Sequence, residues 1–531
     1  MPKPPVHNER TECAAETVPV LIAGAGPSGL ALALELSAQG VAALLVEPRR
    51  TIDTARPRAK TVSARTMELF RRWGVSRALR EAAPIPAQWS SRITFCESVL
   101  GQQIGHLDGA FALDLTDSEL VAEGGQQMPQ PTLERVLREK VARAPGVELR
   151  LGSRVAGVVE KDGFAEVALE DDQGTREYVH AQWVVGADGA RSIVREAMGA
   201  HYDGGAAGRQ NVNITFRCPG LAESIPHVPS LHYWVLNYTS PGVVGPLDLD
   251  GTWWAISTGT EHVSDAAEAR SIVCGLLGQE TDVEIVATDP WQARMLLADR
   301  YRSGRLFVIG DAAHQNPPWG GHGFNTGVGD AANLGWKLGA VLRGWADENL
   351  LDSYASERRP IARRTLDLAE RNMRAVSTDL LGDTAEEIIS RKRDEFHSLG
   401  LVLGYGYTPA ADEQAPEPHL YAPHTQPGNR LPHRRLPDGS SLFDQLSTGF
   451  TVFGAGQAAG ALTEELSARA VPVQQVSDPA VLTLLDQPVV LVRPDQHIAW
   501  AGRDPADVSA VATHALQGFQ PSAPRQWADA S

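Results

Sequence analysis

The sequence predicts an α/β fold, and three observations predict it. First, apolar residues 18–23 and 41–46 flank a helix-like stretch, residues 30–39, as in a βαβ unit with two buried parallel strands. Second, a later apolar run, residues 306–309, ends in a loop rich in glycine and proline that leads into a long helix-like region. Third, residues 210–260 are rich in β-branched and aromatic residues, which favours a separate sheet. Together these patterns predict a Rossmann-like domain with an inserted β-sheet domain.

The turn after the first strand has the spacing of a dinucleotide-binding loop. Gly24, Gly26 and Gly29 follow the strand directly, with Pro27 and Ser28 between the last two glycines. The first glycine makes the tight turn, the second lets the backbone approach a diphosphate, and the third allows close helix–strand packing. Glu47 ends the second strand, where an acid would bind a ribose hydroxyl. Because strand, helix and acid are all in place, the motif is far more specific than three glycines alone.

The loop after residue 309 predicts a second part of the same site. Asp311 follows the strand end, where its carboxylate would accept hydrogen bonds from sugar-alcohol hydroxyls. The loop continues through Pro317, Pro318, Trp319, Gly321 and Gly323 to Phe324 and Asn325, where a helix is expected. A helix N-terminus that is entered from a glycine-rich loop offers free N–H groups and a partial positive charge to an anionic ligand.

Composition limits the classes of protein. A chain of 531 residues predicts two to four domains, and a net charge of −17 argues against nucleic acid and anionic membranes as partners. The four cysteines form no CxxC pair, so neither a disulfide framework nor a metal site is expected. The first residues lack the apolar core of a signal peptide, and a cytoplasmic protein is expected.

Other elements are predicted with less distinctive patterns. We expect a helix over residues 61–73, short strands within 95–119 and one strand over 147–159. Arg358 and Arg359 precede Pro360, which predicts a helix end. Arg493 and Asp495 flank a proline, which predicts a turn between strands. The glycines from 454 to 460 follow a strand, but their spacing favours a turn and a helix start over a second nucleotide loop.

Three motifs, in this order, carry a resemblance to a known family: the Gly24–Gly26–Gly29 turn, then Asp188-Gly189, then Gly310-Asp311. Residues 65–74, 330–338, 491–495 and 499–500 extend it over nearly the whole chain. The chain resembles the single-component FAD-dependent aromatic hydroxylases, or class A flavoprotein monooxygenases, which include phenol and polyketide hydroxylases. It departs from their pattern at Gly329, where many members have a longer polar side chain, and at Trp319, which is bulkier than usual.

The resemblance implies roles for individual residues. Gly24, Gly26, Pro27, Ser28 and Gly29 would hold the FAD diphosphate, Glu47 the adenosine ribose, and Val155 would lie near the adenine. Arg58 and Gln130 would contact the ribityl-phosphate region, and Asp311 the ribityl hydroxyls. Asp188 and Gly189 would serve the FAD site and the approach of NAD(P)H, which would bind transiently. Pro318, Gly321, Gly323, Phe324 and Asn325 would line the pyrimidine edge of the flavin. Tyr233, Trp234, Trp254, Pro317 and Trp319 would contact the substrate. Neither a catalytic side chain nor a metal is assigned.

The resemblance also implies a division of the chain. We expect a flexible tail (1–17), a discontinuous FAD-binding domain (18–94, 120–200 and 295–375) and a substrate domain (95–119 and 201–294). A helical, proline-rich connection (376–424) would lead to a thioredoxin-like domain without CxxC (425–531).

The implied reaction is hydroxylation of a small phenolic or polyketide-like aromatic with NAD(P)H and O2. It would proceed through a flavin C4a-hydroperoxide, which a dry pocket must protect from water. Two alternatives stay open at this point. The same scaffold performs Baeyer–Villiger oxidation or epoxidation in other enzymes, and a flavin-loaded binding protein without activity would carry the same motifs. A homodimer is also expected.

Overall fold

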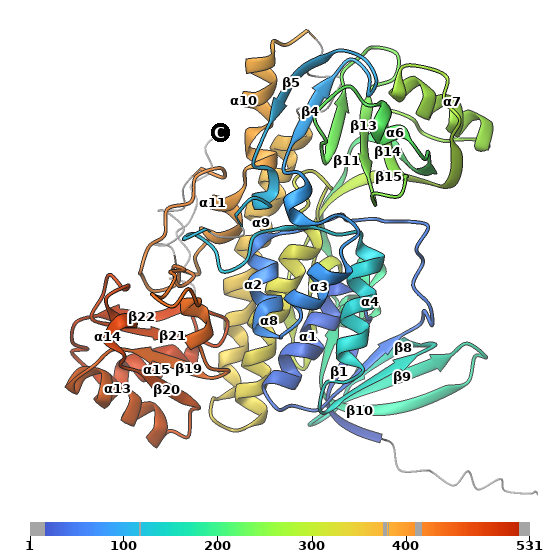
Figure 1. The fold of residues 1–531 in the computed structure, drawn as a ribbon. Coiled ribbons are helices and arrows are strands. Elements are labelled where there is room, and N and C mark those ends of the chain that lie inside the picture. Colours follow the sequence, from blue (N-terminus) through green and yellow to red (C-terminus); the bar gives the residue numbers. More distant parts are fainter. Residues whose placement is uncertain (1–15, 116–117, 375–379, 381, 409–416, 520–531) are drawn as a thin grey trace, which may run out of the picture.

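The computed structural model describes residues 16–115, 118–374, 380, 382–408 and 417–519 (Figure 1). The predicted N-terminal tail lies outside this part of the chain except for its last two residues. Three sheets organise the molecule, together with a small two-stranded pair formed by β3 (Thr61–Val62) and β6 (Gln126–Gln127). The structure therefore has the predicted α/β fold.

The first sheet has eight strands and carries the N-terminal βαβ unit. Its main order is β16 (Arg302–Ser303), β17 (Leu306–Val308), β10 (Arg176–Gly186), β1 (Glu16–Ala23), β2 (Ala43–Glu47) and β7 (Val147–Leu151). The strands from β17 to β7 are parallel. β9 (Ala165–Asp171) pairs antiparallel with β10, and β8 (Ser153–Glu160) pairs with β9. Because the early strand β1 and the late strand β17 both flank β10, their carboxyl ends meet at one edge of the sheet.

Helices α1 (Pro27–Ala38), α2 (Ala64–Arg72), α3 (Ser76–Ala82), α4 (Gln130–Val141) and α8 (Gly323–Leu342) cover this sheet (Figure 1). α1 and α8 approach each other closely because α8 has glycines at the contact. A methyl group on Gly335 would lie 2.5 Å from Cγ of Glu35, and one on Gly339 would lie 2.7 Å from Cβ of Gln39. This close packing holds α1 and α8 side by side.

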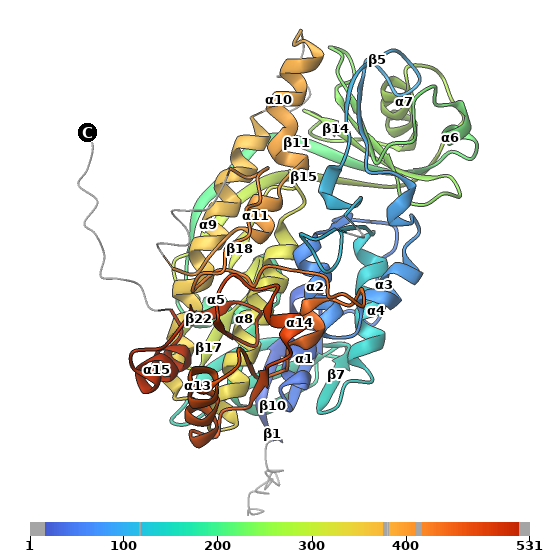
Figure 2. The same ribbon diagram turned by 60° about the vertical axis from the view of Figure 1, so that its left-hand side comes forward.

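The second sheet also has eight strands. Its order is β18 (His314–Gln315), β15 (Glu284–Ala298), β11 (Tyr202–Arg217), β14 (Thr252–Thr258), β13 (Gly242–Pro246), β12 (His232–Val235), β4 (Ile93–Cys96) and β5 (Gln103–Leu107). Helix α7 (Ala266–Leu277) packs on one face, and α10 (Ala385–Phe396) lies at the other (Figures 1 and 2). Short helices α5 (Ile193–Ala197), α6 (Leu221–Ser224) and α11 (Leu399–Leu403) lie in the connections.

The C-terminal unit is built on a four-stranded sheet in the order β20 (Val473–Val476), β19 (Phe450–Phe453), β21 (Val489–Val492) and β22 (Ile498–Gly502). β19 and β20 are parallel, and β21 and β22 are antiparallel to their neighbours. With α13 (Gln457–Ala468), α14 (Pro479–Leu482) and α15 (Val508–Gln517), this is the predicted thioredoxin-like order. The glycine stretch after β19 leads into α13, which confirms a turn and a helix start there.

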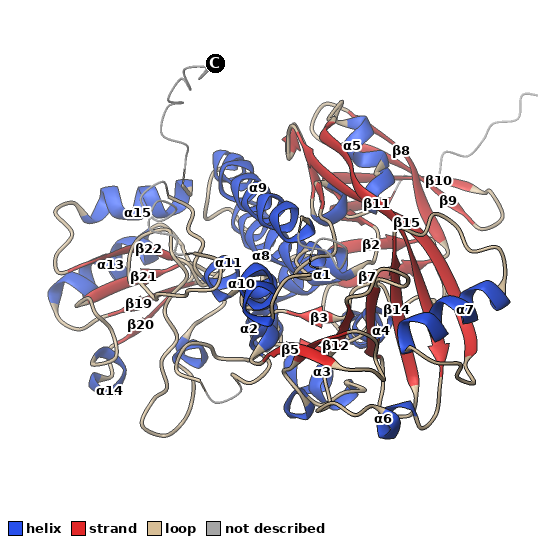
Figure 3. Cartoon of the chain, turned by 90° about the horizontal axis from the view of Figure 1, so that it is seen from above, coloured by secondary structure: helices blue, strands red, loops and turns tan. Residues whose placement is uncertain are grey.

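Helix α8 and helix α9 (Ser353–Met373) lie between the C-terminal unit and the two larger sheets (Figure 3). Trp336 of α8 stacks on Trp345, with ring centroids 6.2 Å apart, and both rings contact Phe450 of β19 edge-on. These buried rings join the C-terminal unit to α8, the same helix whose other end faces the glycine turn.

Several predicted elements need correction. The predicted helix over 61–73 begins only at Ala64, because Thr61 and Val62 pair with β6 and the Ser63 side chain accepts a hydrogen bond from Thr66 N at the helix start. The predicted strand over 147–159 is broken at Gly152, which has a φ of +79°.

Of the two predictions that rest on prolines, one is wrong and one is confirmed. The predicted helix end at 358–360 is wrong, since these residues lie inside α9, where Arg358 is only 1 % exposed. Residues 493–495 form the predicted turn between β21 and β22, but the turn is buried and its two charged side chains belong to an ion-pair network.

Two negative findings concern only the part of the chain that the structure describes. None of its helices is both long and apolar enough to cross a lipid bilayer. Its His, Cys, Asp and Glu side chains nowhere gather in a group of three or more that could hold a metal ion. Cys96, Cys218 and Cys274 are buried free thiols.

Candidate cofactor and substrate site

The glycine turn has a different constraint at each of its three glycines. A methyl group on Gly24, which has a φ of +99°, would lie 2.5 Å from the carbonyl oxygen of Ala187. A methyl group on Gly29 would lie 2.0 Å from the carbonyl oxygen of Gly24. One on Gly26 would meet no atom within 4 Å. The first and third glycines are therefore required by the protein itself, whereas the second faces open space where a ligand can approach.

Glu47 lies directly beside this turn. Its Oε2 accepts a hydrogen bond of 2.8 Å from Ala25 N, and its Oε1 accepts one of 2.7 Å from Nε of Arg49. The side chain is thereby fixed at the end of β2, which is the position expected for a ribose-binding acid.

The late loop packs on the glycine turn. A methyl group on Gly310 would lie 2.4 Å from Oγ of Ser28, and one on Gly327 would lie 2.3 Å from the same oxygen. Two segments almost three hundred residues apart therefore meet at the start of α1. Neither α1 nor α8 has a side-chain hydrogen bond at its N-cap, which is Gly26 in α1 and His322 in α8. Free N–H groups of two helices are thus left for anionic groups of a ligand.

Asp311, Arg58 and Gln130 share one neighbourhood. Asp311 is exposed to solvent. The surrounding protein raises the pKa of its carboxyl by desolvation, whereas the positive charges of His314 and Arg58 lower it. Gln130 N donates hydrogen bonds to the carbonyl oxygens of Pro57 (3.2 Å) and Ala59 (2.9 Å), the residues on either side of Arg58. The three residues predicted to contact the ribityl chain and its phosphate are therefore brought together.

An ion-pair network that sequence reasoning missed holds this loop. Asp330 of α8 accepts hydrogen bonds from Nε2 of His314 (2.8 Å), Nε of Arg358 (2.9 Å) and Gly310 N (3.2 Å). Burial alone would raise the pKa of Asp330, but the charges of His314 and Arg358 hold it below its usual value. His314 is fully buried and serves to position the loop.

Asn325 also has a structural function. Its Oδ1 accepts from Ser63 N (3.0 Å), and its Nδ2 donates to the carbonyl oxygens of Thr61 (3.0 Å) and Gly321 (2.7 Å). The side chain thus joins the start of α8 to β3 and to the glycine loop. Gly323 and Phe324 are half-buried at the first turn of α8, as expected for residues at its entrance.

Asp188 lies next to the glycine turn and at a helix start. Its Oδ2 accepts hydrogen bonds from Ile193 N (2.8 Å) and Val194 N (3.4 Å), the first two residues of α5, whose N-cap is Ser192. Gly189 has a φ of +76° and open space on its Cα. Val155 is buried in β8, within the core of the first sheet. A cofactor role for these three residues stays a prediction.

The predicted aromatic wall divides between two faces of the second sheet. Trp234 and Trp254 pack on the face that contacts α10, and the half-buried Trp319 packs beside them. Tyr233 points to the opposite face, where its hydroxyl accepts a hydrogen bond of 3.1 Å from Ser230 N. The structure therefore separates Tyr233 from the two tryptophans. In the loop before Trp319, Pro317 is buried and Pro318 is exposed.

A cavity of about 190 Å³ opens beside the start of α8. Its lining includes Thr61, Gly321, His322 and Asn325, together with a second group of residues, Phe111, His397 and Val402. Burial lowers the pKa of His322 to about 4, so the imidazole is neutral near pH 7. Sequence reasoning did not find this second group, because its residues come from two segments with no motif of their own.

Comparisons with known proteins agree with this geometry. Residues 17–369 match the model of an FAD binding domain family, and residues 424–520 match that of the aromatic-ring hydroxylase C-terminal domain. The chain belongs to the FAD-dependent aromatic-ring hydroxylases. It is a flavoprotein monooxygenase that uses FAD, a reduced nicotinamide and O2.

Among the relatives of this aromatic-ring hydroxylase is 4-methyl-5-nitrocatechol 5-monooxygenase of Burkholderia sp, 32% identical over 94% of this chain and 97% of the relative. A putative polyketide hydroxylase of Streptomyces halstedii is also 32% identical, over 94% of this chain and 96% of its own length. The solved structure of the rebeccamycin biosynthetic enzyme RebC with reduced flavin has a TM-score of 0.85 and 32% identity, over 95% of this chain and 100% of that one.

The residues of the hydroxylase site fit FAD. The open space over Gly26 and the two uncapped helix starts suit a diphosphate and the flavin edge on which negative charge develops, and Glu47 and Asp311 offer acceptors to hydroxyl groups. When bound, FAD reduced by NAD(P)H activates O2 for insertion of one oxygen atom. The chain itself binds and orients the cofactor and keeps water from it.

Asp311→Ala should weaken FAD binding by one to two orders of magnitude, because hydrogen bonds to a charged group contribute about 1.5–3 kcal/mol each. The fold should survive, since the Asp311 carbonyl keeps its hydrogen bond from the Tyr202 hydroxyl and Gly310 keeps its bond to Asp330. FAD titration of the apoprotein measures the effect, with the fully exposed Asp282 changed to alanine as the control. Wild-type affinity in Asp311→Ala would remove the role assigned to this carboxylate.

Proposed function

We propose that this monooxygenase hydroxylates a phenolic or polyketide-like aromatic compound. The observation that carries the proposal is the convergence of the Gly24–Gly29 turn and the Asp311 loop at one edge of the first sheet, beside a cavity and an aromatic wall. The cavity opens at the start of α8, where the pyrimidine edge of the flavin is expected. Relatives named for a nitrocatechol and for polyketides support an aromatic substrate.

The surroundings of the cavity support protection of a reactive cofactor from water. Trp234 and Trp254 are buried and pack with Phe396 and Ile388 of α10, so the wall beside the site consists mainly of aromatic and aliphatic side chains. The free N–H groups at the start of α8 are already aimed at negative charge, so no reorganisation is needed when charge develops on the flavin.

A panel of phenols and polycyclic aromatics should contain compounds that accelerate NAD(P)H oxidation by the FAD-loaded enzyme. The product should be one oxygen atom heavier than its substrate, with a new hydroxyl on an intact ring by NMR. An epoxide, or a ring expanded to a lactone, would indicate epoxidation or Baeyer–Villiger oxidation instead. Hydrogen peroxide as the only product over the whole panel would contradict the proposal.

A cytoplasmic homodimer stays a prediction from the sequence.

A further inference from the structure

Lys60 places a positive charge between the cofactor site and the aromatic wall. Its Nζ lies 4.3 Å from the ring centroid of Trp254 and donates a hydrogen bond of 2.9 Å to the carbonyl oxygen of Arg58. Across the described segments, no carboxylate forms an ion pair with this ammonium group. The backbone is fixed because the Lys60 carbonyl accepts a hydrogen bond of 2.7 Å from Met128 N.

The chamber around Lys60 is aromatic, and the side chains of Lys60 and His232 in it are half-buried. The imidazole of His232, on β12, contacts the Trp254 ring edge-on, with ring centroids 5.1 Å apart. It also contacts the ring of Phe111, which lines the cavity, with centroids 5.6 Å apart. Burial, with smaller contributions from the charges of Lys60 and Lys392, lowers the pKa of His232 to about 3, so this imidazole is neutral.

A second lysine in the same chamber shows the contrast. Lys392 of α10 lies with its Nζ 3.7 Å from the Trp234 ring centroid, but it forms an ion pair with Glu395 one turn along the helix. The charge of Lys392 is therefore balanced inside the protein, and the charge of Lys60 is not. The protein groups packed around the half-buried Lys60 lower the pKa of its ammonium group to about 8.

The neighbours of Lys60 in the chain locate this charge relative to the site. Arg58 is close enough to Asp311 for its charge to lower the pKa of that carboxyl, and Thr61 lines the cavity. Lys60 thus faces the aromatic wall from the segment that also contacts the expected cofactor position. A ligand with a negatively charged oxygen would give this half-buried ammonium group the acidic partner that it lacks among the described residues.

We infer that Lys60 binds an acidic oxygen of the aromatic substrate, a phenolate or a carboxylate, while the substrate ring packs beside Trp254. The inference deepens the proposed function and rests on it. Lys60 is then a specificity-determining residue. If the oxygen is a phenolate, its negative charge makes the ring carbons ortho and para to it more electron-rich, which favours insertion of oxygen there.

The test uses FAD-loaded enzyme and two probes of similar size, 4-nitrophenol and nitrobenzene, of which only the first ionises. Binding is followed by perturbation of the flavin spectrum, and ionisation of bound 4-nitrophenol by its own visible absorbance. Wild-type enzyme should bind 4-nitrophenol about tenfold more tightly than nitrobenzene. The bound phenol should ionise about one pH unit below the free compound, because one pKa unit corresponds to a tenfold difference in affinity between its two forms.

Lys60→Met should lose about tenfold in affinity for 4-nitrophenol and abolish the shift in its ionisation, with nitrobenzene binding unchanged within about twofold. Lys60→Arg should restore most of both effects, since it restores the charge. Lys161→Met, which changes an exposed lysine on the β8–β9 turn, is the control and should behave as wild type. Flavin content of each variant shows that the cofactor site is intact. Comparison with 4-nitrobenzoate distinguishes a site for phenolate from one for carboxylate.

Equal binding of both probes by wild-type enzyme, or their unchanged binding by Lys60→Met, would overturn the inference. Hydroxylation of phenols by such an enzyme would still leave the proposed function intact. An enzyme that oxidises no NAD(P)H with any aromatic compound, but in which Lys60 binds 4-nitrophenolate, would instead contradict the proposed function alone.

Discussion

Gly26→Ala and Gly29→Ala should both abolish tight FAD binding, but only Gly29→Ala should destabilise the apoprotein. A methyl group on Gly29 would lie 2.0 Å from the Gly24 carbonyl oxygen, so the turn must open or α1 must shift. Overpacking of this kind costs about 1–3 kcal/mol or more. A methyl group on Gly26 meets no protein atom and has an ordinary φ of −74°, so the apoprotein tolerates it. The methyl group would instead occupy the space left for the diphosphate.

Thermal unfolding of the apoproteins and FAD titration separate the two effects. Gly157→Ala, on β8 with open space around its Cα, is the control and should change neither quantity. If Gly26→Ala bound FAD as tightly as wild type, the diphosphate would not pass over this glycine. An apoprotein of Gly29→Ala as stable as wild type would contradict the geometry of the turn.

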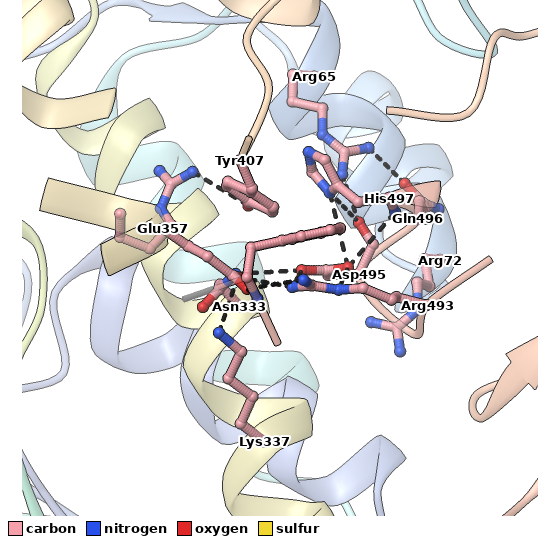
Figure 4. Close-up of polar contacts among 12 residues, drawn as sticks. Arg65, Arg72, Asn333, Lys337, Glu357, Tyr407, Arg493, Asp495, Gln496 and His497 are labelled. Atoms are coloured by element: carbon pink, nitrogen blue, oxygen red, sulfur yellow. Dashed lines mark hydrogen bonds and ion pairs between the residues drawn. The ribbon is translucent and has the colours of Figure 1, made fainter. Parts of the chain in front are cut away.

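Arg493→Met should lower the stability of the protein by about 3–5 kcal/mol, because it leaves buried carboxylates without their partner. Arg493 donates to both oxygens of Glu357 at 2.8 Å and to Asp495 at 2.6 Å and 3.1 Å (Figure 4). Lys337 and Asn333 of α8 bind the same Glu357 at 2.8 Å and 2.6 Å. Removal of one member therefore affects the contact between α8, α9 and the C-terminal unit.

Arg469→Met is the matched control, since Arg469 lies in the same unit but forms a partly exposed ion pair with Glu465. Its loss should cost no more than about 1 kcal/mol. The difference between the midpoints of thermal unfolding of the two variants is the measured quantity. Equal midpoints would show that the network contributes nothing beyond a surface ion pair.

Acid gives a second readout of the same network. Burial alone would raise the pKa of Glu357, but Arg493 and Lys337 hold it at about 2. Because the pKa is lower in the folded than in the unfolded protein, the stabilisation is present above the unfolded value of about 4.3 and is lost as the pH falls towards 2. In Arg493→Met the pKa of Glu357 rises, so this acid-dependent loss should shrink or reverse.

The sequence predicts best those parts of the site whose constraints are local. The glycines at 24, 26 and 29, Glu47 and Asp311 follow strand ends at fixed spacing, and the structure places them around one edge of a sheet. The Asp330 network was missed because its members come together only through tertiary packing. Lys60 was missed for the same reason, since Trp254 is almost two hundred residues away.

Local reasoning failed most clearly at residues 358–360. A proline after two arginines predicts a helix end, but packing against the core and the ion pair of Arg358 with Asp330 keep α9 continuous through Pro360. Helical stability in proteins comes mostly from such packing, which outweighs the loss of one backbone hydrogen bond. The turn at 493–495 shows a related difficulty, because its location follows from local sequence but its burial against α9 does not.

The buried contact between the C-terminal unit and the long helices has a consequence for protein engineering. A chimera that exchanged the last hundred residues with those of a relative would bring in new partners for Glu357 and Asn333 while leaving these two unchanged. A relative that lacked one of these partners would leave a buried charge without one of its ion pairs. Successful recombination in this family should therefore require the crossover point to carry α8, α9 and the C-terminal unit together.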